Sequence, residues 1–199
     1  MGQHERNSIA SIPKPRNDRV ALKSIGGPTE SLLIITGTMG AGKTSVLAEA
    51  SDILALRQIA HAAIDVDALG LAHLPCGDCN NAVIYGNLRS VCENYAALGV
   101  QRFLLARAMQ DRDQLELCRD IVPATNTMVC RLTASIAAMK QRVKMRETGL
   151  SQREYVARVA KLNVILDRVQ LEDFAVTNEN RSLTDVALEV LIKAGWISV

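Results

Sequence analysis

Aromatic residues and net charge are both scarce in this sequence. The 199 residues include two Phe, three Tyr and one Trp, and the formal net charge is +2. Lysines and arginines are mixed with acidic residues along the chain rather than gathered into a stripe. Such a chain lacks the basic surface that attracts nucleic acid and the aromatic platforms on which unpaired bases stack. We therefore expect no nucleic-acid partner.

Long apolar runs and an export signal are also missing. No stretch of about 18 apolar residues occurs, and the polar start of the chain has no apolar core of a signal peptide behind it. We expect a cytoplasmic protein with no membrane partner. The five cysteines are an odd number for a chain of this kind, which favours reduced thiols over a disulfide framework.

What is present is the composition of an ordinary globular protein, with 48% hydrophobic and 22% charged residues. Pro13, Pro15 and the Gly-Gly-Pro sequence at 26–28 interrupt the first part of the chain, which has no sustained periodicity. We expect a flexible N-terminal tail over residues 1–30 and one folded domain over residues 31–199.

Apolar runs of strand length alternate with segments of helical period after residue 30. Strands are expected at 32–36, 62–66, 103–106, 127–132 and 174–177. Helices are expected after the glycines at 37–42, at 83–98, at 111–119, from about Ser135, at 152–170 and, capped by Ser182, to about Ala194. This alternation predicts an α/β fold, a five-stranded parallel sheet with helices on both faces. In such sheets ligands bind beyond the carboxyl ends of the strands, here after Thr36, Val66, Ala106 and Leu132.

Residues 37–44 read Gly-Thr-Met-Gly-Ala-Gly-Lys-Thr and fit the phosphate-loop pattern between an expected strand and an expected helix. Glycines let the backbone curl with its N–H groups inward, and the next helix presents its positive N-terminus to the same anion. The pattern predicts ATP binding, with Lys43 reaching the outer phosphates and the Thr44 hydroxyl as a ligand of Mg²⁺. The expected cofactor-binding residues are Gly37, Thr38, Met39, Gly40, Ala41, Gly42, Lys43, Thr44 and Ser45.

With Gly40 the loop reads Gly-x-x-Gly-x-Gly-Lys-Thr, which resembles the small P-loop kinases, such as shikimate kinase, gluconate kinase, adenylylsulfate kinase and chloramphenicol phosphotransferase. Residues 65–67 are similar to the paired aspartates of these kinases, 131–147 to their fourth strand and lid helix, and 174–182 to their last strand and closing helix. The resemblance implies phosphoryl transfer from ATP. In one respect the chain departs from it, since Arg107 stands where many P-loop proteins place a metal-orienting aspartate.

Asp65 and Asp67 are two residues apart at the end of an expected strand, so an extended chain would point both side chains to the same side. We expect Asp65 to support the metal, since it resembles the first aspartate of the kinase pair, and Asp67 to orient the acceptor hydroxyl. The alternative is that both aspartates cap the next turn.

Arg142 and Arg146 are four residues apart and would share one helix face. The resemblance makes this helix the lid over ATP, where both arginines would serve as catalytic residues that stabilise the charge of the moving phosphoryl group. The alternative is a solvated face in which an arginine pairs with Glu147. Arg107 is expected to hold an anionic substrate, with a surface salt bridge as its alternative.

A second pattern, His73 followed by Cys76 and Cys79, offers three zinc ligands, with Cys92 as a remote fourth. Structural zinc sites usually show two clear ligand pairs, and the second pair is absent here. We expect these cysteines to be small residues in a loop on the substrate side, and we expect no stoichiometric zinc.

The sequence as a whole predicts ATP- and Mg²⁺-dependent phosphoryl transfer to a hydroxyl group of a small molecule. The alternative is an ATP-binding regulatory or interaction module, or a simple ATPase, without a phosphoryl acceptor. The sequence does not identify the acceptor, because the loop from about residue 68 to 81 matches no specific kinase. It does not give the oligomeric state either.

Overall fold

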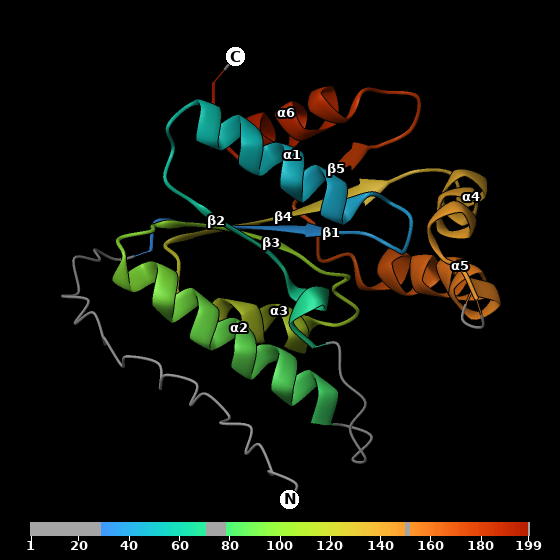
Figure 1. The fold of residues 1–199 in the computed structure, drawn as a ribbon, viewed down its shortest axis with the longest axis horizontal. Helices are drawn as coiled ribbons and strands as arrows, with labels where there is room; N and C mark the ends of the chain where they lie inside the picture. Colours follow the sequence, from blue (N-terminus) through green and yellow to red (C-terminus); the bar gives the residue numbers. More distant parts are fainter. Residues whose placement is uncertain (1–28, 71–78, 150–151, 199) are drawn as a thin grey trace, which may run out of the picture.

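The computed structural model describes residues 29–70, 79–149 and 152–198 of the chain (Figure 1). In chain order the elements are β1 (Ser31–Thr36), α1 (Lys43–Leu56), β2 (Ala62–Asp65), the 3-10 helix η1 (Val66–Gly70), α2 (Cys79–Ala97), β3 (Arg102–Ala106), α3 (Arg112–Ile121), β4 (Asn126–Thr133), α4 (Ile136–Arg146), α5 (Gln152–Val169), β5 (Phe174–Thr177) and α6 (Leu183–Lys193). The predicted alternation of strands and helices is confirmed.

The sheet has five strands in the order β2-β3-β1-β4-β5, and every neighbouring pair is parallel. β1 lies in the middle, where Ile34 pairs with Leu105 of β3 and with Val129 of β4. A strand in this position is buried on both faces, which explains its unbroken run of apolar residues. Truncating one of these side chains to Ala is expected to cost about 2–5 kcal/mol of unfolding free energy.

Helices cover both faces of the sheet, as predicted (Figure 1). Leu33 and Ile35 of β1 belong to the core with α1 and α6, while Leu32 and Ile34 belong to the core with α2 and α3. The alternation follows from the two-residue period of a strand. α4 and α5 pack against each other beyond one end of the sheet. Because β4 leads directly into α4, that end is the carboxyl end of the strands.

Within residues 29–70, 79–149 and 152–198, three helices begin with side-chain caps. Asp111, Ser135 and Ser182 each accept a hydrogen bond from a backbone N–H in the first turn of α3, α4 and α6. Such a contact satisfies one of the otherwise unpaired N–H groups at a helix start. The caps therefore fix where these helices begin, and they agree with the predicted boundaries.

The second strand ends earlier than predicted. β2 stops at Asp65, and Val66 begins the 3-10 helix η1. The Asp65 carboxylate accepts a hydrogen bond from the Asp67 N–H (3.1 Å), which closes this turn. Asp65 therefore caps the turn, and the extended geometry expected for residues 65–67 is wrong.

Residues 1–28 of the expected tail, together with His73 and Cys76, lie outside the described residues, and the side chain of Cys79 is not described either. Cys92, Cys118 and Cys130 are free and buried, as expected for reduced thiols. Burial raises the pKa of each to about 12. Cys92 lies on α2 and packs in the core with residues of the sheet and α3. No described helix is both long enough and apolar enough to span a membrane.

Candidate functional site

The phosphate loop, residues 37–44, connects β1 to the first residues of α1 as predicted. Gly40 and Gly42 have φ values of +78° and +97°. A Cβ at Gly40 would lie 2.4 Å from the Met139 carbonyl oxygen, and one at Gly42 would lie 2.2 Å from Asn178 Nδ2. Both positions therefore need glycine for conformation and for space.

Lys43 begins α1 at the mouth of the loop, and its Nζ donates to the Thr38 carbonyl oxygen at 3.3 Å. Burial lowers the pKa of Lys43 below its usual range, while Asp67 and Asp65 oppose the shift and Arg146 adds to it. The ammonium group is thus short of solvent and held by a single carbonyl oxygen in the described structure. An incoming phosphate oxygen would supply the negative charge that this group lacks.

Thr44 and Asp65 form the closest side-chain contact in this region, with the Thr44 hydroxyl donating to Asp65 Oδ2 at 2.6 Å. The two groups offer hard oxygen ligands from α1 and from the end of β2, which suits Mg²⁺. Across the described residues no cluster of three or more His, Cys, Asp or Glu side chains could hold a metal by itself. Phosphate oxygens and waters would complete the octahedron, so the residues present fit a magnesium ion that arrives with a nucleotide.

Arg107 lies at the carboxyl end of β3 and is buried, with a side-chain exposure of 8%. Its guanidinium contacts Asp67 Oδ1 at 3.5 Å, donates to Asn81 Oδ1 at 3.0 Å and stacks over the Tyr85 ring with a centroid distance of 5.0 Å. Its Nε has no hydrogen-bond partner in the described structure. Burial raises the pKa of Tyr85 to about 12. Arg107 is therefore a buried guanidinium paired with Asp67, whose side chain is 61% exposed. An ion pair is present, as in the alternative considered above, but its cation is buried.

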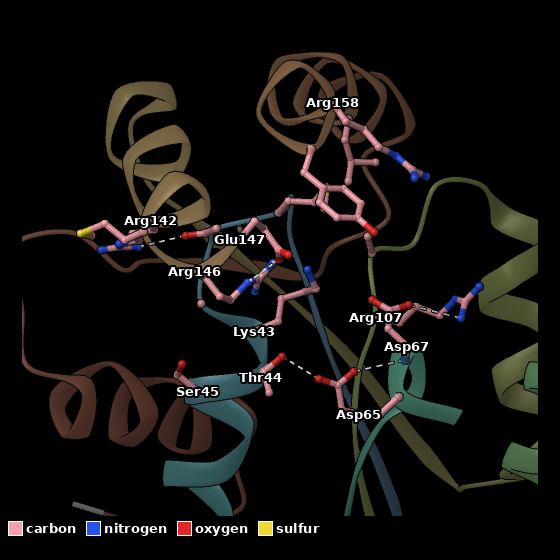
Figure 2. A pocket seen from close by; sticks show the side chains of 18 of the residues that line it. Lys43, Thr44, Ser45, Asp65, Asp67, Arg107, Arg142, Arg146, Glu147 and Arg158 are labelled. Carbon is pink, nitrogen blue, oxygen red and sulfur yellow. Dashed lines mark hydrogen bonds and ion pairs between the residues drawn. The ribbon is translucent and has the colours of Figure 1, made fainter. Parts of the chain in front are cut away.

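The two lid arginines have different surroundings. Arg142 donates to the backbone oxygens of Gly40 (3.2 Å) and Asn178 (2.7 Å). Arg146, one turn further along α4, is exposed and pairs with Glu147 at 2.8 Å. Arg142 is thus bound to the protein backbone, while Arg146 is exposed and its ion-pair partner Glu147 is partly buried. In Figure 2 both side chains come from the α4 side and lie above Lys43.

These side chains line one cavity of about 870 Å³. That volume lies within the range of roughly 300–1,000 Å³ that is usual for small-molecule sites. The loop and the Thr44–Asp65 pair form one part of the wall, and Asp67 with Arg107 forms another (Figure 2). Among the predicted site residues, those that line this cavity are Met39, Gly40, Gly42, Lys43, Thr44, Ser45, Asp65, Asp67, Arg107, Arg142 and Arg146.

The lining residues outside the predicted set include Gln110, Tyr155, Arg158 and Leu162. Gln110 follows the carboxyl end of β3, and attention to the whole segment after that strand would have identified it. The other three lie on α5 at spacings of three and four residues, which is one face of a helix. Their periodicity is visible in the sequence, but only the folded lid shows that this face meets the cavity.

No protein-family model matches the chain, and no curated protein matches it either. Solved structures do match. The APS kinase of Mycobacterium tuberculosis, solved with AMPPNP and APS, is 21% identical with a TM-score of 0.57 over 84% of this chain and 98% of its own. A gluconokinase from Sinorhizobium meliloti 1021 is 16% identical, with a TM-score of 0.57 over 85% of this chain and 94% of its own. Shikimate kinase from Bacteroides thetaiotaomicron is 13% identical, with a TM-score of 0.58 over 83% and 98% of the two chains.

At these identities the likeness shows the fold alone. The chain has the α/β fold of the small P-loop kinases, and its structural neighbours belong to that group. The resemblance drawn from residues 37–44 and the three further segments is thereby confirmed at the level of the fold.

Proposed function

We propose that this protein is an ATP- and Mg²⁺-dependent kinase that transfers the terminal phosphoryl group of ATP to a hydroxyl group of a small molecule. The observation that carries the proposal is that one cavity joins the phosphate loop and the Thr44–Asp65 pair to a second polar wall at Asp67 and Arg107. Small-molecule kinases with this fold, including one solved with AMPPNP and APS, support it.

The nucleotide occupies the end of the cavity formed by the loop. Backbone N–H groups of residues 37–45 and the N-terminus of α1 face its phosphates, and Lys43 neutralises the outer ones. Thr44 and Asp65 would hold the magnesium ion that accompanies ATP. That ion would supply positive charge to offset the charge of the phosphates.

The acceptor occupies the end of the cavity near Asp67. The acceptor oxygen forms a bond to the γ-phosphorus as the bond from that phosphorus to the β–γ bridging oxygen breaks, so ADP leaves. Asp67 accepts the proton of the hydroxyl group. Arg107 fixes one oxygen of Asp67 and places positive charge on this wall, which favours an acceptor with an anionic group.

The lid supplies the remaining positive charge. Arg146 is exposed at the cavity and exchanges Glu147 for an oxygen of the moving phosphoryl group. Arg142 lines the same cavity and contributes its charge from beside the Gly40 carbonyl. Charge stabilisation and positioning are the main tasks of a protein in phosphoryl transfer. The two lid arginines are groups of the type that these tasks need.

The test is to incubate the protein with ATP, Mg²⁺ and pools of hydroxylated metabolites, with anionic ones in a separate pool, and to search by mass spectrometry for a metabolite that gains one phosphoryl group. The Lys43→Ala variant in the same pools is the control for contaminating kinases. A phosphorylated product that appears with the wild type and not with the variant is the expected result.

ATP hydrolysis at an equal rate with and without every pool would instead identify a simple ATPase. Mg²⁺-ATP binding with neither hydrolysis nor transfer would identify a regulatory or interaction module. Failure to bind Mg²⁺-ATP at all would overturn the assignment of the loop itself.

A further inference from the structure

The outer side of the phosphate loop is held by side chains and backbone from the far end of the chain. The Gly40 carbonyl accepts from Arg142 (3.2 Å), and the Ala41 carbonyl accepts from Asn178 Nδ2 (2.8 Å). The buried Thr38 hydroxyl donates to the Val159 carbonyl of α5 at 3.1 Å. Three positions of the loop are thus hydrogen-bonded to α4, to the segment after β5 and to α5.

These contacts decide which way the loop N–H groups point. A trans peptide is planar, so its N–H is antiparallel to its C=O, and a carbonyl held on one side turns the next N–H to the other side. The Ala41 carbonyl is held outward by Asn178, and the Gly42 N–H therefore turns toward the inside of the loop. An unpaired buried carbonyl would be free to rotate and would carry a desolvation cost of about 1–3 kcal/mol.

Asn178 forms hydrogen bonds with β4, with α4 and with the phosphate loop. It is buried at 8% exposure, directly after β5, and its N–H donates to the Thr133 carbonyl of β4 (2.8 Å). Its own carbonyl accepts from Arg142 at 2.7 Å, and its side chain packs against Gly42, where an added Cβ would lie 2.2 Å away. The side chain thus fills the space that Gly42 leaves.

The next residue attaches the same segment to the start of α4. Glu179 accepts from the Ser135 N–H at 2.7 Å and from the Ser135 hydroxyl at 2.8 Å. The segment after β5 therefore holds α4 both at its N-terminus and at Arg142. The phosphate loop, residues 178–179 and α4 form one hydrogen-bonded unit.

We propose that Asn178 is a positioning residue for nucleotide binding, which keeps the loop N–H groups facing the phosphates and, through Arg142, couples the loop to α4. The proposal rests on ATP binding at the loop and does not require phosphoryl transfer. Coupling of this kind is reciprocal: if the contacts to α4 help the loop to bind ATP, then ATP stabilises α4.

The first experiment compares Mg²⁺-ATP binding by wild type, Asn178→Ala and Asn178→Ser in calorimetric titrations. The Asn180→Gly variant is the matched control, because Asn180 lies in the same segment, is exposed and has a φ of +56° that glycine accepts. We expect about a tenfold weaker affinity for both Asn178 variants, the size of one lost hydrogen bond, and an unchanged affinity for the control.

The second experiment follows amide hydrogen exchange with and without Mg²⁺-ATP. In the wild type and in Asn180→Gly, nucleotide is expected to slow exchange across α4. In Asn178→Ala this slowing is expected to be lost, while the rest of the sheet keeps its protection. A purely structural role for Asn178 would lower thermal stability in all states and leave the nucleotide-dependent slowing intact.

Equal ATP affinity in the Asn178 variants and the wild type, or unchanged slowing in α4, would overturn the proposal. If the wild type itself fails to bind Mg²⁺-ATP, the proposed function is wrong, and only the orientation of the loop N–H groups by Asn178 is left to test, without nucleotide. In that case faster exchange of the Gly42 amide in Asn178→Ala than in Asn180→Gly supports it, and equal exchange contradicts it.

Discussion

At the scale of single residues, Lys43 offers a direct test of the phosphate loop. Its Nζ contacts the Thr38 carbonyl and projects into the cavity rather than into the core. We expect Lys43→Ala to weaken Mg²⁺-ATP binding about 10- to 100-fold, since one charge-assisted contact contributes about 1.5–3 kcal/mol, and to leave the circular dichroism spectrum unchanged.

Lys144→Ala is the matched control for this change, because Lys144 is an exposed lysine on α4 that does not line the cavity. A similar loss of affinity in both variants would indicate a general charge effect. Equal ATP affinity in Lys43→Ala and the wild type would reject the loop as the nucleotide site.

The two aspartates are expected to divide metal binding from proton transfer. Asp65→Asn removes the charge beside Thr44 but keeps an oxygen for the Asp67 N–H, so we expect the Mg²⁺ concentration needed for ATP binding to rise while the fold persists. Asp67→Asn is expected to leave Mg²⁺-ATP binding unchanged and to lower acceptor-dependent turnover about 10²- to 10⁴-fold.

Calorimetric titrations at several Mg²⁺ concentrations, followed by rates with the acceptor from the screen, measure both effects. Asp52→Asn, an exposed position on α1 that does not line the cavity, is the control. If Asp65→Asn and Asp67→Asn both match the wild type in Mg²⁺ requirement and in turnover, the two aspartates have only a structural role in the turn after β2.

At the scale of elements, the contact between Glu179 and the start of α4 predicts a pH dependence of stability. The pKa of Glu179 is lowered from 4.5, first by the hydrogen bond from the Ser135 N–H and then by that from its hydroxyl. The contribution of this contact is therefore fully present above pH 4.5 and is lost as the pH falls through the lowered pKa.

Thermal unfolding from pH 7 to pH 3 tests this contact. We expect Glu179→Gln to lose less stability than the wild type over that acid range. The pKa of Glu189 is also lowered, chiefly by its hydrogen bond to Lys193, so Glu189→Gln should remove a separate part of the acid dependence. Identical acid profiles for Glu179→Gln and the wild type would show that the contact does not contribute in solution.

The elements themselves were predictable from local sequence, because their signals are local. Strand runs, helical periods and the cap Ser182 depend on neighbouring residues, and the structure agrees with them. The end of β2 was not predictable in this way. The contact of Asp65 with Thr44, 21 positions away, helps to fix that carboxylate where it closes the turn.

The site was predictable in its loop and less so in its surroundings. Residues 37–44 carry their own pattern, whereas the burial of Arg107 depends on Asn81 and Tyr85 of α2, which the periodicity of β3 cannot show. Asn178 stood at the carboxyl end of a predicted strand, but its partner Ala41 belongs to another part of the chain.

At the scale of the whole molecule, the cavity joins α1, η1, the end of β3, α4 and α5, so a ligand there should stabilise the entire fold. A ligand at 100 times its Kd adds about 2.7 kcal/mol to the unfolding free energy. For a protein of this length that corresponds to a rise in Tm of about 5–10 °C.

Scanning fluorimetry with Mg²⁺-ATP measures this shift, with Lys43→Ala at the same concentrations as the control. The variant is expected to show a much smaller rise. An equal rise in both proteins would place nucleotide binding elsewhere on the molecule.

The distance in sequence between the phosphate loop and its supports has a consequence for synthesis of the protein. Ala41 and Asn178 are 137 positions apart, and Thr38 and Val159 are 121 apart. At about 5–20 residues per second, the ribosome completes the loop roughly 7–30 seconds before it adds Asn178. The loop therefore lacks these supports until residues 159 and 178 have been synthesised, so ATP meets the supported loop only after that point. For the first part of that interval the apolar strand β1 also lacks its later neighbours β3 and β4, so its unpaired edges are exposed to aggregation until those strands are added.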